Sequence, residues 1–279
     1  MFKNILVHIP TETLARPVVD VSISLAVQTK AHLDAIAVGY EAMSEVGFVA
    51  EPLAAVAAVI EIQQQQAMER ADAAISVFET EAKYADISHA TRTIAAPPAE
   101  AEEVIGRLAR CYDLTVVLQP DSSHSVFDNS IPRVVLFNSG GPMLMVPRIH
   151  KGPLNARHVG IAWDGSRTAA RALRDALPFL KAAQAVTMIA VNEQQDGASE
   201  AAADKIATHL ARHRINTKIE RLTADRGDVQ GTILSAVIDN GIDMLVMGGY
   251  GHSRIKEYIL GGVTKGMFDS MTVPTLMSH

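Results

Sequence analysis

Four glycines near the end of this 279-residue chain have the type and spacing best suited to chemistry. They follow a predicted apolar strand at 243–247 in the order Gly248-x2-Gly251-x9-Gly261-Gly262. Glycine lets backbone N–H groups approach a bound anion closely, and a helix N-terminus favours negative charge. A strand, a glycine loop and a glycine-led helix therefore predict a phosphate site that needs no lysine. The spacing matches neither a Walker A loop nor a GxGxxG fingerprint.

The elements that position these glycines occur twice along the chain. In the second half, strands are predicted at 158–163, 185–192, 217–222, 243–247 and 273–277, and helices at 167–181, 199–213, 228–239 and 261–270. The first half repeats the strands at 4–8, 34–38, 88–94, 114–118 and 143–146. The alternation of strands and helices predicts two tandem α/β domains, each a doubly wound parallel sheet.

The domain boundary is predicted near 148–155, where Pro147, Gly152 and Pro153 interrupt the periodicity. This gives domains at 1–150 and 154–279. The first domain has extra length at 53–83, which predicts one or two helices. A packing helix over the sheet is the favoured interpretation, and a partner-binding or lid element is the alternative.

The repeated order and the glycine spacing resemble the universal stress protein family, whose signature is G-x2-G-x9-G-[ST]. The resemblance covers nearly the whole chain and implies two fused domains of the adenine nucleotide α-hydrolase-like fold. It is closest in the second half.

The resemblance implies an adenine nucleotide site in the second domain. Asp164, beside Ala162 after the first strand, would contact the adenosine moiety, and the backbone of Val191 would contact adenine. The loop glycines would hold the phosphates, and His252 in the loop is either a phosphate partner or a solvated histidine. The full set is Ala162, Asp164, Val191, Met247, Gly248, Gly251, His252, Gly261, Gly262 and Val263. The ligand implied is ATP or a related adenine nucleotide, with Mg²⁺ as an accompanying ion.

Two departures from the signature matter. Gly262 stands where the family has Ser or Thr, so one hydroxyl donor is lost while the backbone N–H remains, and phosphate contact should weaken. The first domain's loop at 118–124 has no glycine and adds Asp121, which should repel phosphate, and His8 replaces the acidic residue. The first domain is therefore interpreted as a degenerate copy, kept for packing or for another ligand.

Composition limits the partners. The net charge of −6 is spread along the chain, so a nucleic-acid surface is not expected. The first ten residues are too short an apolar run for a signal peptide, and there is no 18-residue apolar span, so a cytoplasmic protein without a membrane partner is expected. The single Cys111 fits a reducing compartment.

Catalytic residues are not predicted. His209 and His213 are four apart on a helix, but a third metal ligand is missing and a solvated face is favoured. No nucleophile elbow or Cys/His pair is present. Binding is favoured over turnover, with at most a slow ATPase.

Three functions remain open from the sequence. The leading hypothesis is a stress-response protein that binds an adenine nucleotide and acts as a regulatory switch toward an unknown protein partner. The alternatives are a scaffold or small-molecule carrier without nucleotide, and an adenylating α-hydrolase-type enzyme. The final strands of the two halves are expected to pair, making an intrachain pseudo-dimer, and a homodimer of chains is a further expectation.

Overall fold

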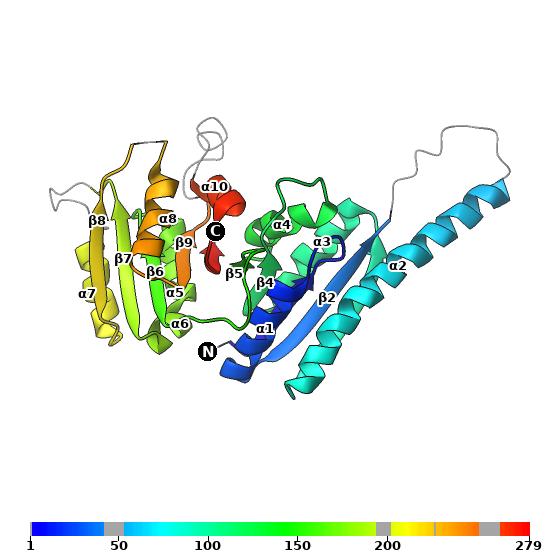
Figure 1. Cartoon of the computed structure of the whole chain (residues 1–279), viewed down its shortest axis with the longest axis horizontal. Helices are drawn as coiled ribbons and strands as arrows, with labels where there is room; N and C mark the ends of the chain where they lie inside the picture. Colours follow the sequence, from blue (N-terminus) through cyan, green and yellow to red (C-terminus); the bar gives the residue numbers. More distant parts are fainter. Residues whose placement is uncertain (1, 42–52, 194–201, 226, 251–262) are drawn as a thin grey trace.

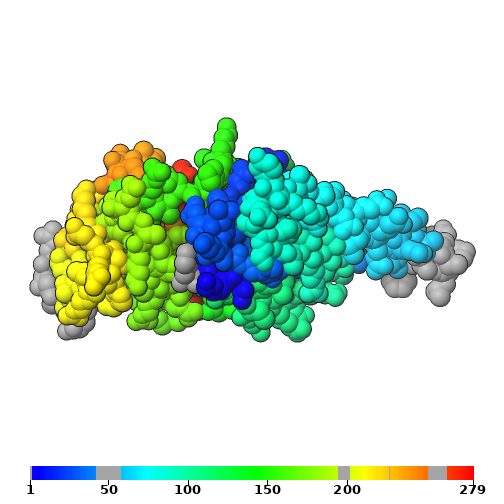
Figure 2. Space-filling view, turned by 90° about the horizontal axis from the view of Figure 1, so that it is seen from below, coloured from blue at the N-terminus to red at the C-terminus, as the bar shows by residue number. Residues whose placement is uncertain are grey.

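The computed structural model describes residues 2–41, 53–193, 202–225, 227–250 and 263–279, with only the backbone described at 53–57. The molecule is elongated, with the two halves side by side along its length and the N-terminus near the middle (Figures 1 and 2).

Ten strands form one sheet across the described residues. They are β1 (Asn4–Ile9), β2 (His32–Tyr40), β3 (His89–Ala96), β4 (Leu114–Leu118), β5 (Met143–Val146), β6 (His158–Ala162), β7 (Ala185–Val191), β8 (Thr217–Leu222), β9 (Met244–Gly248) and β10 (Thr275–Ser278). Their order is β3-β2-β1-β4-β5-β10-β9-β6-β7-β8, so the same strand order occurs twice in opposite directions. The predicted α/β fold with parallel sheets is confirmed.

The helices are α1 (Arg16–Thr29), α2 (Leu53–Tyr84), α3 (Pro98–Leu108), α4 (Ile131–Asn138), α5 (Arg167–Asp175), α6 (Leu177–Ala182), α7 (Ala203–Arg212), α8 (Val229–Asp239) and α10 (Val263–Ser270). Two short 3-10 helices, η1 (Ala109–Cys111) and η2 (Phe127–Ser130), precede β4 and α4. The single helix predicted at 167–181 is two helices, because Pro178 at the start of α6 lacks the N–H that a continuous helix requires.

Both faces of the sheet are covered. One apolar core lies under α1, α2, α5, α6 and α7, and the other lies under α3, α4, α8 and α10. In each half the earlier helices therefore cover one face of the sheet and the last two cover the other, as a doubly wound fold requires.

The two halves meet where β5 pairs with β10. The pairing is antiparallel, with Leu144 opposite Leu276 and Met143 opposite Met277, and all eight residues of these two strands are buried. The predicted pairing of the final strands is confirmed. It closes two apolar strand edges that would otherwise be open to other chains.

In both halves, an aspartate accepts backbone hydrogen bonds at the start of the first strand. Asp113 Oδ2 accepts hydrogen bonds from the backbone N–H groups of Lys3 and Asn4. Asp243 does the same for Arg157 and His158, through Oδ2 and Oδ1. This correspondence aligns Asn4 with His158. The predicted domain limits of 1–150 and 154–279 stay a prediction, although residues 147–157 contain no helix or strand.

Helix α2 is one continuous helix of 32 residues, where the sequence left one or two open. Its second half packs on the sheet through Ala71, Ile75 and Phe78. Its first half extends beyond the sheet (Figures 1 and 2). None of the described helices is both long enough and apolar enough to span a membrane.

Candidate functional site

The second half has its topological switch point between β6 and β9. These strands are parallel neighbours, and Ala162 lies opposite Met247 on one side and Ile189 of β7 on the other. Helix α5, which follows β6, packs on one face, and α10, which follows β9, packs on the other. In open α/β sheets, ligands bind in the crevice that such diverging loops leave at the carboxyl edge.

The predicted residues on β6, β7 and β9 come together at this edge. Met247 and Gly248 end β9 beside Ala162, and Val191 ends β7 two residues beyond the partner of Ala162. Val263 begins α10. Gly251, His252, Gly261 and Gly262 lie in 251–262, outside the described residues, so their predicted roles stay predictions.

Asp164 is exposed at the start of the loop after β6. Its Oδ1 accepts a hydrogen bond from the Ser166 backbone N–H at 2.9 Å, across Gly165, which has a positive φ of 74°. Ser166 in turn caps α5, since its Oγ accepts from the Ala169 N–H at 3.1 Å. The carboxylate therefore orders the turn and keeps its other oxygen for a further partner, while the positive end of the α5 dipole faces the same edge.

Gly248 is required by packing as well as by any ligand. A Cβ atom at this position would lie 2.4 Å from the Ala169 nitrogen and 2.6 Å from the Thr168 Oγ1. The end of β9 is thus pressed against the first turn of α5. This contact explains the first glycine of the motif without phosphate, which the sequence could not show.

Thr264 supplies a hydroxyl near the place where the family signature has one. It is buried in the first turn of α10, and its Oγ1 accepts the Tyr250 backbone N–H at 3.0 Å. Sequence reasoning noted the loss of the hydroxyl at Gly262 and missed this one two residues later. The hydroxyl fixes Tyr250, which has a left-handed φ of 50°.

The first half has an equivalent switch point between β1 and β4, and its own carboxylate occupies it. Asp128 is 8% exposed and accepts hydrogen bonds from the Thr11 and Glu12 N–H groups through Oδ2, both at 3.0 Å. Its Oδ1 accepts the Tyr40 hydroxyl at 3.0 Å and lies 3.6 Å from His8 Nε2. An internal anion therefore takes the loop amides that could otherwise face a ligand.

Glu12 returns the interaction. Its Oε2 accepts the N–H groups of Phe127 and Asp128 at 2.6 and 3.2 Å, so the loops after β1 and β4 are bonded in both directions. Burial raises the pKa of Glu12, and these backbone hydrogen bonds oppose that shift. Burial also raises the pKa of the Tyr40 hydroxyl, and Asp128 raises it further. The hydroxyl therefore remains a hydrogen-bond donor.

His8 is 2% exposed, and burial lowers its pKa more strongly than the nearby Asp128 raises it. Because Asn4 is equivalent to His158, His8 is equivalent to Ala162, and the residue equivalent to Asp164 is Pro10. The expectation that His8 replaces the acidic residue Asp164 is therefore wrong by two residues, because β1 continues to Ile9.

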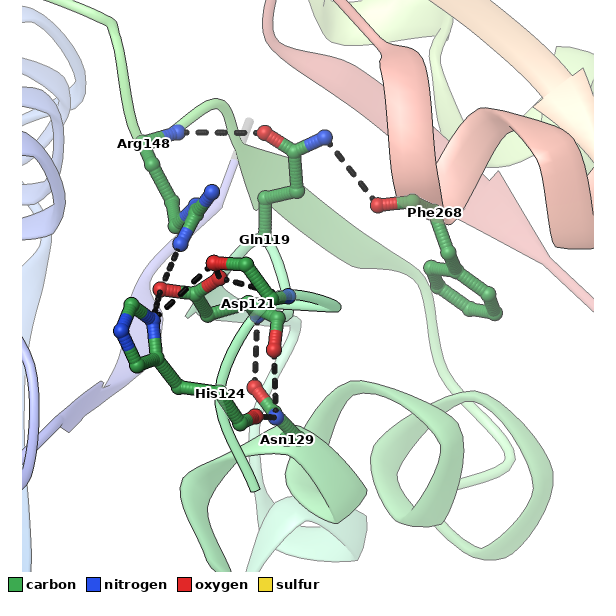
Figure 3. A network of polar contacts seen from close by, with 7 residues as sticks. Gln119, Asp121, His124, Asn129, Arg148 and Phe268 are labelled. Carbon is green, nitrogen blue, oxygen red and sulfur yellow. Dashed lines mark hydrogen bonds and ion pairs between the residues drawn. The ribbon is translucent and has the colours of Figure 1, made fainter. Parts of the chain in front are cut away.

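A second polar cluster closes the loop after β4 (Figure 3). Asp121 pairs with Arg148, accepts from Ser123 and lies 2.9 Å from His124 Nδ1. The hydrogen bond from Ser123 is the first cause that holds the pKa of Asp121 below its usual range. The expected repulsion of phosphate by Asp121 is thus weakened, because Arg148 balances its charge.

The Ser123, His124 and Asp121 side chains do not form a catalytic triad. Ser123 Oγ and Asp121 Oδ2 both approach the same ring nitrogen, His124 Nδ1, at 3.0 and 2.9 Å. A triad needs the two ring nitrogens to face different partners. Asn129 instead ties the loop together by bonding Asp121 and His124 main-chain atoms.

The second half matches the family model described as the Universal stress protein family, over residues 155–279. Residues 155–279 belong to the universal stress protein family. No curated protein sequence matches the chain.

Solved structures extend the likeness in fold to the whole chain. A universal stress protein from Archaeoglobus fulgidus is 15% identical with a TM-score of 0.70, over 98% of this chain and 95% of that one. A putative universal stress protein from Pseudomonas aeruginosa UCBPP-PA14 is 14% identical with a TM-score of 0.60, over 99% and 93%. At these identities the likeness shows that both halves have the universal stress protein fold.

The histidine pair singled out in the sequence lies at the end of α7. Among the described residues, no three His, Cys, Asp or Glu side chains gather as metal ligands would. His209 and His213 have ring centroids 4.9 Å apart on α7, with His209 exposed.

Proposed function

We propose that the second half binds ATP or a related adenine nucleotide at the carboxyl edge of β6, β7 and β9, and that occupancy acts as a regulatory switch. Stress response in the cytoplasm is the setting that the family and the composition favour. The observation that carries the proposal is the meeting of Ala162, Met247 and Gly248 at a switch point with Asp164 exposed beside it.

The residues present suit the parts of a nucleotide. Ala162 presents only a methyl group at the end of β6, Gly248 lets α5 approach the end of β9 closely, and the backbone at Val191 can face a base. Asp164 has a carboxylate oxygen available for the ribose hydroxyls, since only Oδ1 is used by Ser166. The α5 N-terminus and the glycines at 251, 261 and 262 would favour the phosphates, with Mg²⁺ reducing their charge. Any ATP hydrolysis would be slow, and protein partners would sense the occupied surface.

Calorimetric titration of the intact chain with ATP, ADP and AMP, with and without Mg²⁺, tests this proposal. Asp164→Ala should weaken ATP and adenosine binding by about tenfold, since a charge-assisted hydrogen bond is lost, and should leave triphosphate binding nearly unchanged.

Asp164→Asn is the matched control, because its side-chain oxygen can still accept from Ser166 and only the charge is removed. An intermediate loss would assign the effect to the ribose contact. Equal losses for ATP and triphosphate would contradict that role, and no binding of any adenine nucleotide by the intact chain would favour the carrier or scaffold.

A further inference from the structure

The described base of the glycine loop, Gly249 and Tyr250, lies against a helix of the other half of the chain. A Cβ atom on Gly249 would lie 2.8 Å from Leu136 Cδ2, near the end of α4. The next residue, Phe137, has its ring centroid 5.0 Å from that of Tyr250. Phe137 and Tyr250, which are far apart in sequence, therefore pack together behind the end of β9, and we call this aromatic contact the wall.

His279 completes this wall. Its ring lies 4.8 Å from Phe137 at an interplanar angle of 72°, and its Nδ1 is 3.0 Å from the Gly249 carbonyl oxygen. An edge-to-face arrangement of this kind is attractive beyond the apolar area it buries. Phe137 thus contacts both groups that flank the Gly249 main chain.

The Tyr250 backbone needs such support. Its φ of 50° lies in the left-handed region, which a residue with a side chain adopts only where its surroundings fix it. The Thr264 hydroxyl holds its N–H, and Phe137 and Phe268 flank its ring, the latter at 6.4 Å between centroids. Tyr250 sets the direction in which the chain leaves β9.

We propose that Phe137, in the first half, is a positioning residue for the nucleotide site of the second half. The inference rests on the proposed nucleotide function. In this role Phe137 acts through its contacts with Tyr250 and His279 and not through the ligand. It holds Gly249 and Tyr250 at the end of β9 in one conformation, so this part of the site is formed by both halves of the chain.

The opposite edge of the sheet provides a matched comparison. Gln119 N donates to Val146 O as Gly249 N donates to Ser278 O, so the two residues are equivalent. At that edge the contact between halves is polar, from Gln119 Nε2 to the Phe268 carbonyl oxygen at 3.0 Å (Figure 3). Of these two equivalent positions, the one at the end of β9 has the aromatic contact between the halves, through Phe137 and Tyr250.

The test uses four full-length proteins: wild type, Phe137→Ala, Phe137→Tyr and the control Gln119→Ala. ATP affinity is measured by calorimetry, and amide hydrogen exchange of Gly249 and Tyr250 is measured without nucleotide. Phe137→Ala should weaken ATP binding about tenfold and speed exchange at both amides. Phe137→Tyr, whose ring is retained at a half-buried position, should restore both, and Gln119→Ala should change neither.

The outcomes separate the two proposals. Wild-type binding with unchanged ATP affinity in Phe137→Ala would overturn the positioning role and leave the nucleotide function standing. Equal losses in Phe137→Ala and Gln119→Ala would assign the effect to general loosening of the two halves and would also overturn it. A wild-type chain that binds no adenine nucleotide would overturn the proposed nucleotide function. The exchange rates of the Gly249 and Tyr250 amides would then still show whether Phe137 holds this backbone in place.

Discussion

The two switch points of this molecule share a topology and differ in what fills them. In the first half, Asp128 takes two loop amides and the Tyr40 hydroxyl, and Glu12 bonds back to the opposite loop. In the second half, small residues, Ala162 and Gly248, end the central strands, and Asp164 lies exposed. In the first half, the Asp128 carboxylate satisfies the loop N–H groups from within the chain. The comparison shows that the two copies of one topology differ in a few loop side chains.

The largest expected effect tests the second copy at its loop. Replacing Gly251 with valine should place a branched side chain in the proposed phosphate space and lower ATP affinity by at least about 100-fold, roughly 3 kcal/mol. Calorimetry measures the affinity, and a thermal melt checks that the fold survives. Unchanged ATP affinity would contradict the proposed phosphate site in the second half.

The next effect tests the first copy. Asp128→Ala should leave the Thr11 and Glu12 N–H groups and the Tyr40 hydroxyl without an acceptor, and should lower the free energy of unfolding by about 3 kcal/mol. Urea denaturation measures this loss. Asp128→Asn, which keeps one acceptor oxygen, should lose less. ATP affinity should be unchanged in both variants, and a fall in affinity would mean that the copies are coupled through α4.

Two glycine substitutions test the packing role of Gly248. Gly248→Ala should lower stability by about 1–3 kcal/mol, because its Cβ would lie 2.4 Å from the Ala169 nitrogen. Gly141→Ala is the control, since its Cβ would meet only the Tyr112 carbonyl oxygen at 3.7 Å. Its effect should stay within about 0.5 kcal/mol. Equal stability of the two variants by thermal melting would contradict the close approach of β9 to α5.

The smallest effect is a pH dependence confined to the first copy. Burial lowers the pKa of His8, so the unfolded chain binds more protons below its ordinary value of about 6.5, and stability should fall by at most about 1 kcal/mol as pH drops from 7.5 to 5.5. The charged group that faces His8 is Asp128, 3.6 Å away, and Tyr40 and Glu12 contact Asp128 in turn. The raised pKa of Glu12 acts in the opposite direction, adding stability as pH falls toward 5 and below.

Denaturation between pH 8 and 5.5 should show this slope in the wild type and lose it in His8→Gln. A slope that persists in the variant would place the titration elsewhere.

The sequence predicted the repeated strand order well because buried parallel strands are continuous apolar runs. The strands at 114–118 and 143–146 are buried apolar runs of this kind, and the structure has them with the predicted bounds. The strand at 217–222 also has the predicted bounds, although it contains charged residues and is only partly buried. The break between α5 and α6 was missed because the apolar spacing continues across it, although Pro178 signalled it.

The site was only partly predictable. Ala162, Met247 and Gly248 meet because strand order brings them together, and the family pattern placed them. Asp128 could not be found from sequence, since its role depends on the approach of loops 116 or more residues apart. Thr264 could have been found by looking for a hydroxyl within one helical turn of Gly262.

The antiparallel junction of β5 and β10 lies within one continuous chain, joined by the segment at 147–157. Contact between the halves is therefore a unimolecular event with an effective concentration set by that short connection, and dilution of the protein does not weaken it. A pair of separate single-domain chains would instead assemble and come apart as their abundance changed. The two halves of this chain therefore stay in contact equally when the cell holds few copies and when it holds many.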